Sequence, residues 1–183
     1  MKINEGINVI AKSIKECIRT EIKDDGLLSD VQTFIPSYRI DEGFEDPCIW
    51  LVEHETTPAE GQKGNLSHKQ YLQTPFEFVC IVYDEDDLEQ SEIKGRDLAG
   101  RVVRSLIKNF TRLTKDKGVK FTQPIFDALY PIGFKEIDEI GAKVVATSVK
   151  LIFQYYVDWN IMRLPLDTLK KQKKHCEELH AHI

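Results

Sequence analysis

Two groups of residues have side chains of the types that metal chemistry needs. The first is Asp84 with the triplet Glu92-Ile93-Lys94, which together offer two carboxylates and a lysine, the set that metal-dependent nucleases use. Such nucleases place the triplet on a core strand, whereas here it falls in a predicted helix. Acidic side chains just before a helix also favour the positive end of its dipole. We therefore interpret the acidic run 84–87 as a solvated helix start.

The second group is His175, Cys176, His180 and His182, close to the end of the sequence. Imidazole and thiolate groups are good zinc ligands. However, His175 and His180 are five residues apart, which places them on different faces of a helix. We predict no metal site and no cofactor, and the sequence leaves open whether these four side chains ever bind a metal.

Sequence motifs for catalysis are missing from the chain. It has no GxSxG nucleophile turn, no GxxxxGK[ST] phosphate loop and no HExxH zinc motif. No nucleophile is matched with an acid–base pair. We therefore predict that the protein is not an enzyme.

The length and charge of the chain indicate a single domain that does not bind nucleic acid strongly. The chain has 183 residues, of which 42% are hydrophobic and 30% charged, and its net charge is −5. This length suits one domain, which we assign to residues 1–160, with 161–183 as a C-terminal extension that is a short helix or flexible. No basic stripe is present, so strong binding to nucleic-acid phosphates is not expected.

Cysteine usage and hydropathy indicate the compartment. Cys80 lies in an apolar run typical of a strand and Cys17 lies on an apolar helical stripe, which predicts buried, reduced thiols. Residues 1–22 are charged throughout, unlike a signal peptide, and no apolar run reaches the roughly 18 residues of a membrane span. We expect a protein that is made in a cytoplasm and has no membrane partner.

Hydrophobic periodicity predicts the elements that must position any functional side chain. Apolar residues at steps of three and four predict helices over 3–23 and about 88–114. Gly26 is available for a left-handed cap after the first helix. A polar loop is expected over 56–67, and an apolar segment over 124–134 leads to a hairpin end at 135–141. Strands are predicted over 31–35, 47–55, 68–83, 119–122 and 143–158.

This order predicts an α+β fold with a mostly antiparallel sheet of four or more strands and two long helices packed on one face. In the last strand, alternate residues from Val145 to Val157 form one apolar face, and the residues between them are mostly polar. Such alternation is typical of an antiparallel strand with one dry face. We expect Val145, Val149, Leu151 and Phe153 to contact the helices.

Several polar and aromatic side chains are assigned structural roles rather than catalytic ones. Glu77 and the other acidic residues near strand ends are interpreted as solvated surface. His54 and His68 flank the polar loop and are interpreted as a pair of surface histidines. Trp50 and Trp159 are interpreted as core or interface anchors.

A series of features from residue 3 to residue 158 matches one family. An amphipathic helix and a short strand precede the strand Pro47-Cys48-Ile49-Trp50-Leu51-Val52-Glu53 and a polar loop. A long strand then ends in Phe78-Val79-Cys80-Ile81-Val82-Tyr83, and an acidic turn opens a helix with Arg96, Ala99, Val102, Leu106 and Ile107. The hairpin that closes the series ends in Phe153-Gln154-Tyr155-Tyr156-Val157. In this order of elements the chain resembles the tail terminator proteins of long-tailed bacteriophages, also called tail-completion or minor tail proteins of the neck.

The resemblance implies a structural virion protein of the tail or neck. It implies a homohexameric ring that caps the tail tube, stops its polymerisation and provides the surface that joins the head connector. The expected partners are other copies of the chain, the major tail tube protein and a head-completion or connector protein. DNA is expected to pass through the lumen without specific binding, since an acidic wall repels phosphates.

The polar loop 56–67 is the main candidate for an interface. A dozen residues is long for a connection between strands, and polar side chains there cannot repay burial without partners. We therefore predict that the loop contacts an adjacent subunit or the tail tube. The candidate interface residues are Thr57, Glu60, Gln62, Lys63, Asn65, Glu136, Asp138, Glu139 and Trp159.

Other functions remain as alternatives. Within the structural class, the chain would be a head-completion protein at the portal. From different classes, it would be a small metal-dependent nuclease that uses the acidic clusters, or a ligand-binding regulatory domain with a β-sheet cradle. Cleavage of DNA with Mg²⁺ would identify the nuclease, and assembly into a ring would identify a structural subunit.

Overall fold

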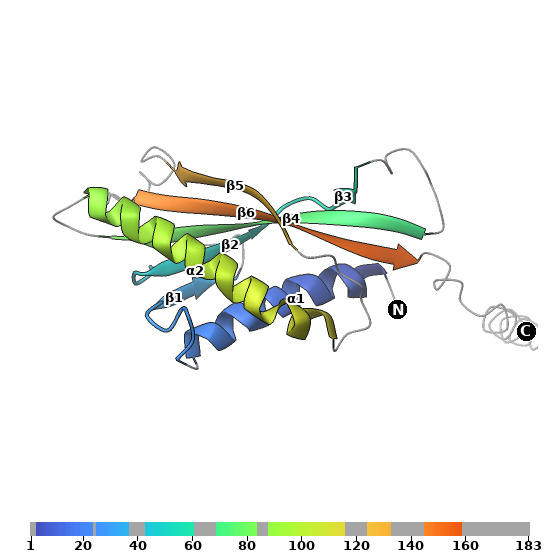
Figure 1. Ribbon diagram of the computed structural model, residues 1–183, viewed down its shortest axis with the longest axis horizontal. Coiled ribbons are helices and arrows are strands. Elements are labelled where there is room, and N and C mark those ends of the chain that lie inside the picture. The colour runs from blue at the N-terminus through green and yellow to red at the C-terminus, as the bar shows by residue number, and fades with distance from the viewer. Residues whose placement is uncertain are drawn as a thin grey trace, which may run out of the picture.

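The structure is a computed structural model, and it describes residues 3–23, 25–36, 43–60, 69–83, 88–115, 124–132 and 145–158. This part of the chain has an α+β fold (Figure 1). Both predicted helices and four of the predicted strands are confirmed, with ends that differ by a few residues. The elements are α1 (Ile3–Lys23), β1 (Thr33–Ile35), β2 (Cys48–Glu53), β3 (Thr57–Pro58), β4 (Lys69–Val82), α2 (Leu88–Lys115), β5 (Ile125–Ile132) and β6 (Val145–Asp158).

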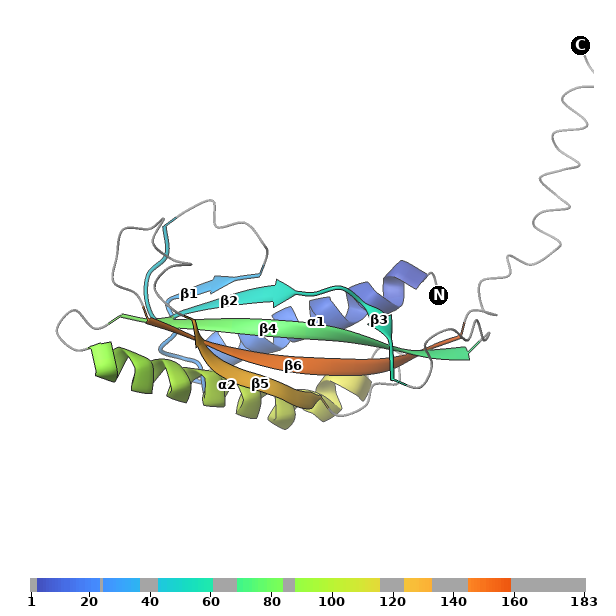
Figure 2. The ribbon, with the colours of Figure 1, turned by 90° about the horizontal axis from the view of Figure 1, so that it is seen from above.

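All these strands belong to one sheet of six. Five of them follow the order β1-β2-β4-β6-β5, and β3 pairs with β4 next to the segment that pairs with β2. Only β1 and β2 run parallel among the described pairs, so the sheet is mixed but mostly antiparallel. β4 and β6 pair along fourteen residues each and form the centre of the sheet (Figure 2).

The main hydrophobic core combines both helices with alternate residues of the central strands. Isoleucines of α1 and apolar residues of α2 recur at steps of four, as expected for one face of a helix. Val149, Leu151 and Phe153 belong to this core, as predicted for the dry face of β6. Its buried members include Ile10, Ile14, Ile18, Leu98, Val102, Leu106, Phe76, Phe78, Leu151, Phe153 and Tyr155.

A smaller cluster lies on the other face of the sheet, because neighbouring residues along a strand point to opposite faces. Its buried members are Cys48, Val79, Ile81 and Ala146, and Trp50 packs against them as a half-buried anchor. Ala146 and Ser148 were expected on the solvated side of β6 but are fully buried. The expectation of a polar outer face is wrong for this end of β6, because this cluster and polar side chains of neighbouring strands cover it.

The end of α1 differs from the sequence prediction. Asp25, rather than Gly26, has a left-handed backbone with φ of 49°. Gly26 is needed for a different reason, since a Cβ there would overlap the backbone of Glu21. The chain therefore turns back tightly against the last turn of the helix.

The beginning of the predicted loop 56–67 is part of the sheet. Thr57 and Pro58 form β3, opposite Gln73 and Leu72 of β4. The Thr56 hydroxyl lies 2.7 Å from the hydroxyl of Thr74. The prediction that the loop begins at residue 56 is wrong, because the main chain continues to pair with β4 beyond β2.

The apolar segment predicted over 124–134 is strand β5, the edge strand beside β6 (Figure 1). Its residues pair with β6 from Ile125 opposite Ile152 to Ile132 opposite Ala146. The strand predicted over 119–122 and the hairpin end predicted over 135–141 lie outside the described residues. None of the described helices is long and apolar enough to cross a membrane.

Candidate functional site

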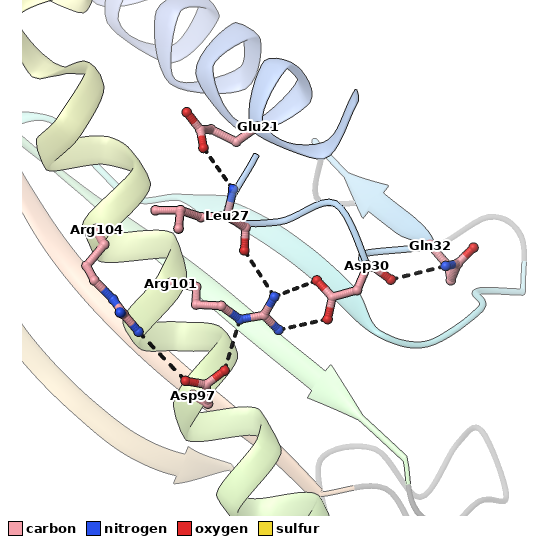
Figure 3. Close-up of polar contacts among 7 residues, drawn as sticks. All are labelled: Glu21, Leu27, Asp30, Gln32, Asp97, Arg101 and Arg104. Carbon is pink, nitrogen blue, oxygen red and sulfur yellow. Dashed lines mark hydrogen bonds and ion pairs between the residues drawn. The ribbon is translucent and has the colours of Figure 1, made fainter. Parts of the chain in front are cut away.

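Arg101 of α2 holds the connection between α1 and β1 against the helix (Figure 3). Its guanidinium donates to the carbonyl oxygen of Leu27 at 3.0 Å and to both carboxylate oxygens of Asp30. Its Nε lies 3.0 Å from Oδ2 of Asp97. Hydrogen bonds from Arg101 keep the pKa of the Asp30 carboxyl below its usual value, against the opposing effect of burial. These contacts position α2 relative to the start of the sheet.

Glu21 strengthens this connection from the last turn of α1. Its buried carboxylate accepts hydrogen bonds from the Leu27 N–H at 3.0 Å and from the Asn109 amide at 2.7 Å, and it pairs with Lys108. Burial by itself raises the pKa of the Glu21 carboxyl, but the hydrogen bonds outweigh this effect and leave the pKa below its usual value. A charged carboxylate therefore joins both helices and the following turn.

Replacing Arg101 with alanine should lower the free energy of unfolding by about 1–3 kcal/mol, because the partly buried Leu27 carbonyl and the exposed Asp30 carboxylate lose hydrogen bonds to a charged group. Arg104→Ala is the matched control. The Arg104 side chain is 63% exposed and pairs with Asp97 at 3.7 Å, so its loss should cost less than about 0.5 kcal/mol. Urea unfolding followed by circular dichroism compares the two variants, and equal losses would contradict the role of Arg101.

A second polar group lies around Glu77 in β4, on the face of the sheet away from the main core. Glu77 Oε1 accepts hydrogen bonds from Ser148 Oγ and from Tyr130 OH, both at 2.5 Å. Its Oε2 lies 2.7 Å from Nε2 of His54, and the Glu77 side chain is only 13% exposed. We call these four residues the Glu77 cluster. They join β4, β5, β6 and the residue that follows β2.

The interpretation of Glu77 as solvated surface is wrong, because three side chains replace water around its carboxylate. Burial raises the pKa of the Glu77 carboxyl, but hydrogen bonds from Ser148, Tyr130 and His54 outweigh this effect and leave the pKa below its usual value. A carboxylate with a lowered pKa is a weak general base. The cluster is therefore suited to holding strands together rather than to proton transfer.

Further charges lie beside the Glu77 cluster. Lys150 of β6 is directly opposite Glu77 in the strand register. Its Nζ lies 3.8 Å from the Asp127 carboxylate of β5. His54 was interpreted as one of two surface histidines, and its observed partner is Glu77 instead; His68 lies outside the described residues.

Edge strand β5 exposes apolar side chains on both of its faces. None of its eight residues is buried. Phe126 and Leu129 lie on the side of the main core, since they pair with core residues of β6. Ile125 and Tyr130 lie on the other side. We call these four residues the β5 surface, and their exposed fractions are Ile125 45%, Phe126 56%, Leu129 41% and Tyr130 39%.

The outer edge of β5 is a poor template for a long continuous strand. The register shifts between Phe126 and Ala128, and Pro131 lacks a backbone N–H. Bulges and prolines are features that limit edge-to-edge pairing. Side chains of the β5 surface, more than its main chain, are therefore available for contacts.

Two of the predicted interface residues fall in the described part of the chain. Thr57 is half-buried in β3 and accepts a hydrogen bond from the Gln73 amide at 3.4 Å. Glu60 is exposed just after β3. The other candidates lie outside the described residues: Gln62, Lys63, Asn65, Glu136, Asp138, Glu139 and Trp159.

The residues considered for metal chemistry are mostly outside the described ranges as well. Glu92 and Lys94 lie on α2, as predicted, and Glu92 pairs with Arg96 at 2.5 Å on its exposed side. Among the residues that the structure describes, no three His, Cys, Asp or Glu side chains are placed to hold a metal ion. Asp84, Asp87, His175, Cys176, His180 and His182 are not among the described residues.

The cysteines of the described ranges are buried free thiols, as predicted for Cys17 and Cys80. Burial, with a smaller effect of Asp46, raises the pKa of the Cys48 thiol to about 12. Thiols of this kind are unreactive, since the thiolate is the nucleophile.

No protein-family model matches the chain, and no curated protein matches its sequence. The resemblance to tail terminator proteins therefore stays a prediction from the sequence.

Proposed function

We propose that the protein is a structural subunit of a phage virion that assembles with copies of itself into a ring, with six copies as the expected number. The ring would cap the tail tube, stop its polymerisation and provide the surface that joins the head connector. The observation that carries this proposal is the β5 surface. Apolar side chains exposed on both faces of an edge strand lose contact with water when another molecule covers them, which favours binding there.

The proposed packing of both helices on one face of the sheet explains why contacts between copies would form at β5. Residues of α1 and α2 share one core cluster with Phe78 and its register partners Leu51 and Val149. We take both helices to cover this one face of the sheet. The opposite face and β5 then remain for contacts with neighbouring copies.

The area of the β5 surface allows an estimate of the free energy of binding that it contributes. Aromatic side chains bury about 150–250 Å² each and aliphatic ones somewhat less, so these four side chains, which are about half exposed, offer roughly 350 Å². At about 25 cal/mol per Å² this burial contributes roughly 9 kcal/mol. Association costs an estimated 4–15 kcal/mol, so the β5 surface supports weak self-association and needs further contacts for a stable ring. Glu60, exposed just after β3, and the predicted interface residues that follow it in the sequence are our candidates for those contacts.

The proposal also accounts for the charge of the chain. A net charge of −5 without a basic stripe suits a ring through which DNA passes without binding. Partners would be the major tail tube protein on one side and a head-completion or connector protein on the other. The protein would act by binding alone, without catalysis or a cofactor.

Addition of the purified protein to polymerising tail tube subunits tests this function. We expect tubes to stop growing and to carry extra density at one end in negative-stain electron micrographs. Growth of tubes to the same length with and without the protein would contradict a terminator role. Cleavage of duplex DNA with Mg²⁺ by the same preparation, abolished in Asp87→Ala with Glu92→Ala, would instead favour a nuclease.

A further inference from the structure

Strand β5 is attached to the sheet without a buried side chain of its own. No β5 residue is among the buried members of either hydrophobic cluster, and Ile132 packs against the smaller one as a partly buried residue. Strands with few buried contacts open locally at a small free-energy cost. The backbone ladder with β6 and side-chain links to its neighbours must therefore hold β5 in place.

The Tyr130–Glu77 hydrogen bond is the link that reaches furthest into the sheet. Tyr130 is directly opposite Ser148 of β6, yet its hydroxyl passes over β6 to the carboxylate of Glu77 in β4 at 2.5 Å. Ser148 donates to the same carboxylate oxygen. One carboxylate thus connects β5 and β6 to the central strand β4, and hydrogen bonds to a charged group are stronger than neutral ones.

We propose that the hydrogen bond from Tyr130 to Glu77 holds β5 in the sheet and positions the β5 surface for contacts between copies. We call this hydrogen bond the latch. The second half of this inference rests on the proposed function, and the first half does not. Glu77 and Tyr130 act here as positioning residues. Loosening the latch would let β5 move and would misplace Phe126 and Leu129.

The charged groups around the latch set its dependence on pH. Glu77 is faced by His54 next to β2, by Lys150 of β6 and by Tyr130 of β5, and Lys150 also pairs with Asp127 of β5. Because the folded-state pKa of Glu77 is lowered, its stabilising effect is present above the unfolded pKa of about 4.3 and is lost as the pH falls through the folded pKa. The latch should therefore be closed at neutral pH and open in acid.

Tyr130→Phe tests the latch, since it keeps the ring on the β5 surface and removes the hydroxyl that donates to Glu77. We expect amide hydrogens of β5 to exchange roughly tenfold faster in the variant at neutral pH, with amides of β2 unchanged. Tyr71→Phe is the matched control. Tyr71 is similarly exposed and lies on β4, six residues from Glu77. Unchanged exchange of β5 in Tyr130→Phe, or equal acceleration in all strands or in both variants, would overturn the inference.

A pH series separates the latch from the neighbouring ion pair. In the unmodified chain, protection of the β5 amides relative to β2 should stay constant from pH 7 down to the unfolded pKa of Glu77 and should fall as the pH is lowered further through the folded pKa. In Tyr130→Phe this protection should change little with pH, because the variant lacks the hydrogen bond to Glu77 at every pH. Asp127→Asn removes the link to Lys150 and should leave the dependence in place. A flat profile in the unmodified chain, or one flattened only by Asp127→Asn, would contradict the role of Glu77 in the latch.

Exchange in the single chain and assembly of the ring are separate measurements. If β5 loosens in Tyr130→Phe while the unmodified chain forms no ring, the latch stands and the proposed function fails. If the unmodified chain forms a ring and Tyr130→Phe loosens β5 without weakening the ring, the positioning role of the latch is wrong. We expect both the loosening and a weaker ring.

Discussion

The double substitution Phe126→Ser with Leu129→Ser should abolish assembly of copies while the single chain stays folded. Both side chains are about half exposed on β5, so their loss costs the fold little. In an interface they would bury roughly 180 Å², which contributes about 4–5 kcal/mol. Association should therefore weaken by about a thousandfold or more. Analytical ultracentrifugation over a concentration series measures this effect.

The matched control for this variant is Ile93→Ser with Ile107→Ser on α2. These two isoleucines are exposed to a similar extent as the β5 residues but lie on a helix instead of the edge strand. The control should assemble like the unmodified chain. Normal assembly of the β5 variant, or equal loss in both double variants, would show that contacts between copies do not depend on the β5 surface.

Phe76→Ala should cause the largest loss of stability among single substitutions in the core. Phe76 is fully buried in β4, and its ring meets that of Phe153 edge to face at 5.5 Å between centroids. Removing it loses the transfer free energy of the ring and leaves a cavity between the sheet and the helices, at a cost of about 3–5 kcal/mol. The midpoint of thermal unfolding should fall by about 10 °C for a chain of this length.

Tyr71→Ala provides the comparison for this core variant. Tyr71 lies on the same strand and is exposed, and its ring meets that of Tyr156. Its loss should cost about 1 kcal/mol or less, since little buried area is removed. A cost below about 1 kcal/mol for Phe76→Ala would contradict the position of Phe76 in the core.

Sequence periodicity was sufficient to predict the helices and the central strands, and most of the side chains that they contribute to the main core. Ile10, Ile14 and Ile18 recur at helical spacing and are all buried in the main core. Val149, Leu151 and Phe153 alternate along β6 and face the same core. These patterns are local, because each follows from the geometry of one element.

Contacts between distant elements could not be read from the sequence in the same way. Glu77 stands between two apolar residues of β4, which shows that it faces away from the main core. Its burial depends on Tyr130 and Ser148, which are 53 and 71 residues away. Strand register decides such contacts, and a one-residue change in register would move every side chain to the other face.

Backbone pairing of the loop and of the edge strand could not be predicted from the sequence either. Polar composition predicted a loop from residue 56, but Thr57 pairs with Gln73 because β4 extends beyond β2. Pro124, just before β5, and Pro131, within it, made this strand hard to predict, since proline is unfavourable within a sheet. An edge strand tolerates Pro131, and only the sheet order shows that β5 is at the edge.

The mass of the protein in solution tests the ring most directly. Light scattering coupled to size exclusion, over a concentration series at neutral pH and with the tail tube protein present or absent, measures it. We predict a species of about six times the 21.1 kDa chain mass, either alone at high concentration or on the end of the tube. A chain that stays monomeric at every concentration and does not bind the tube would contradict the proposed function.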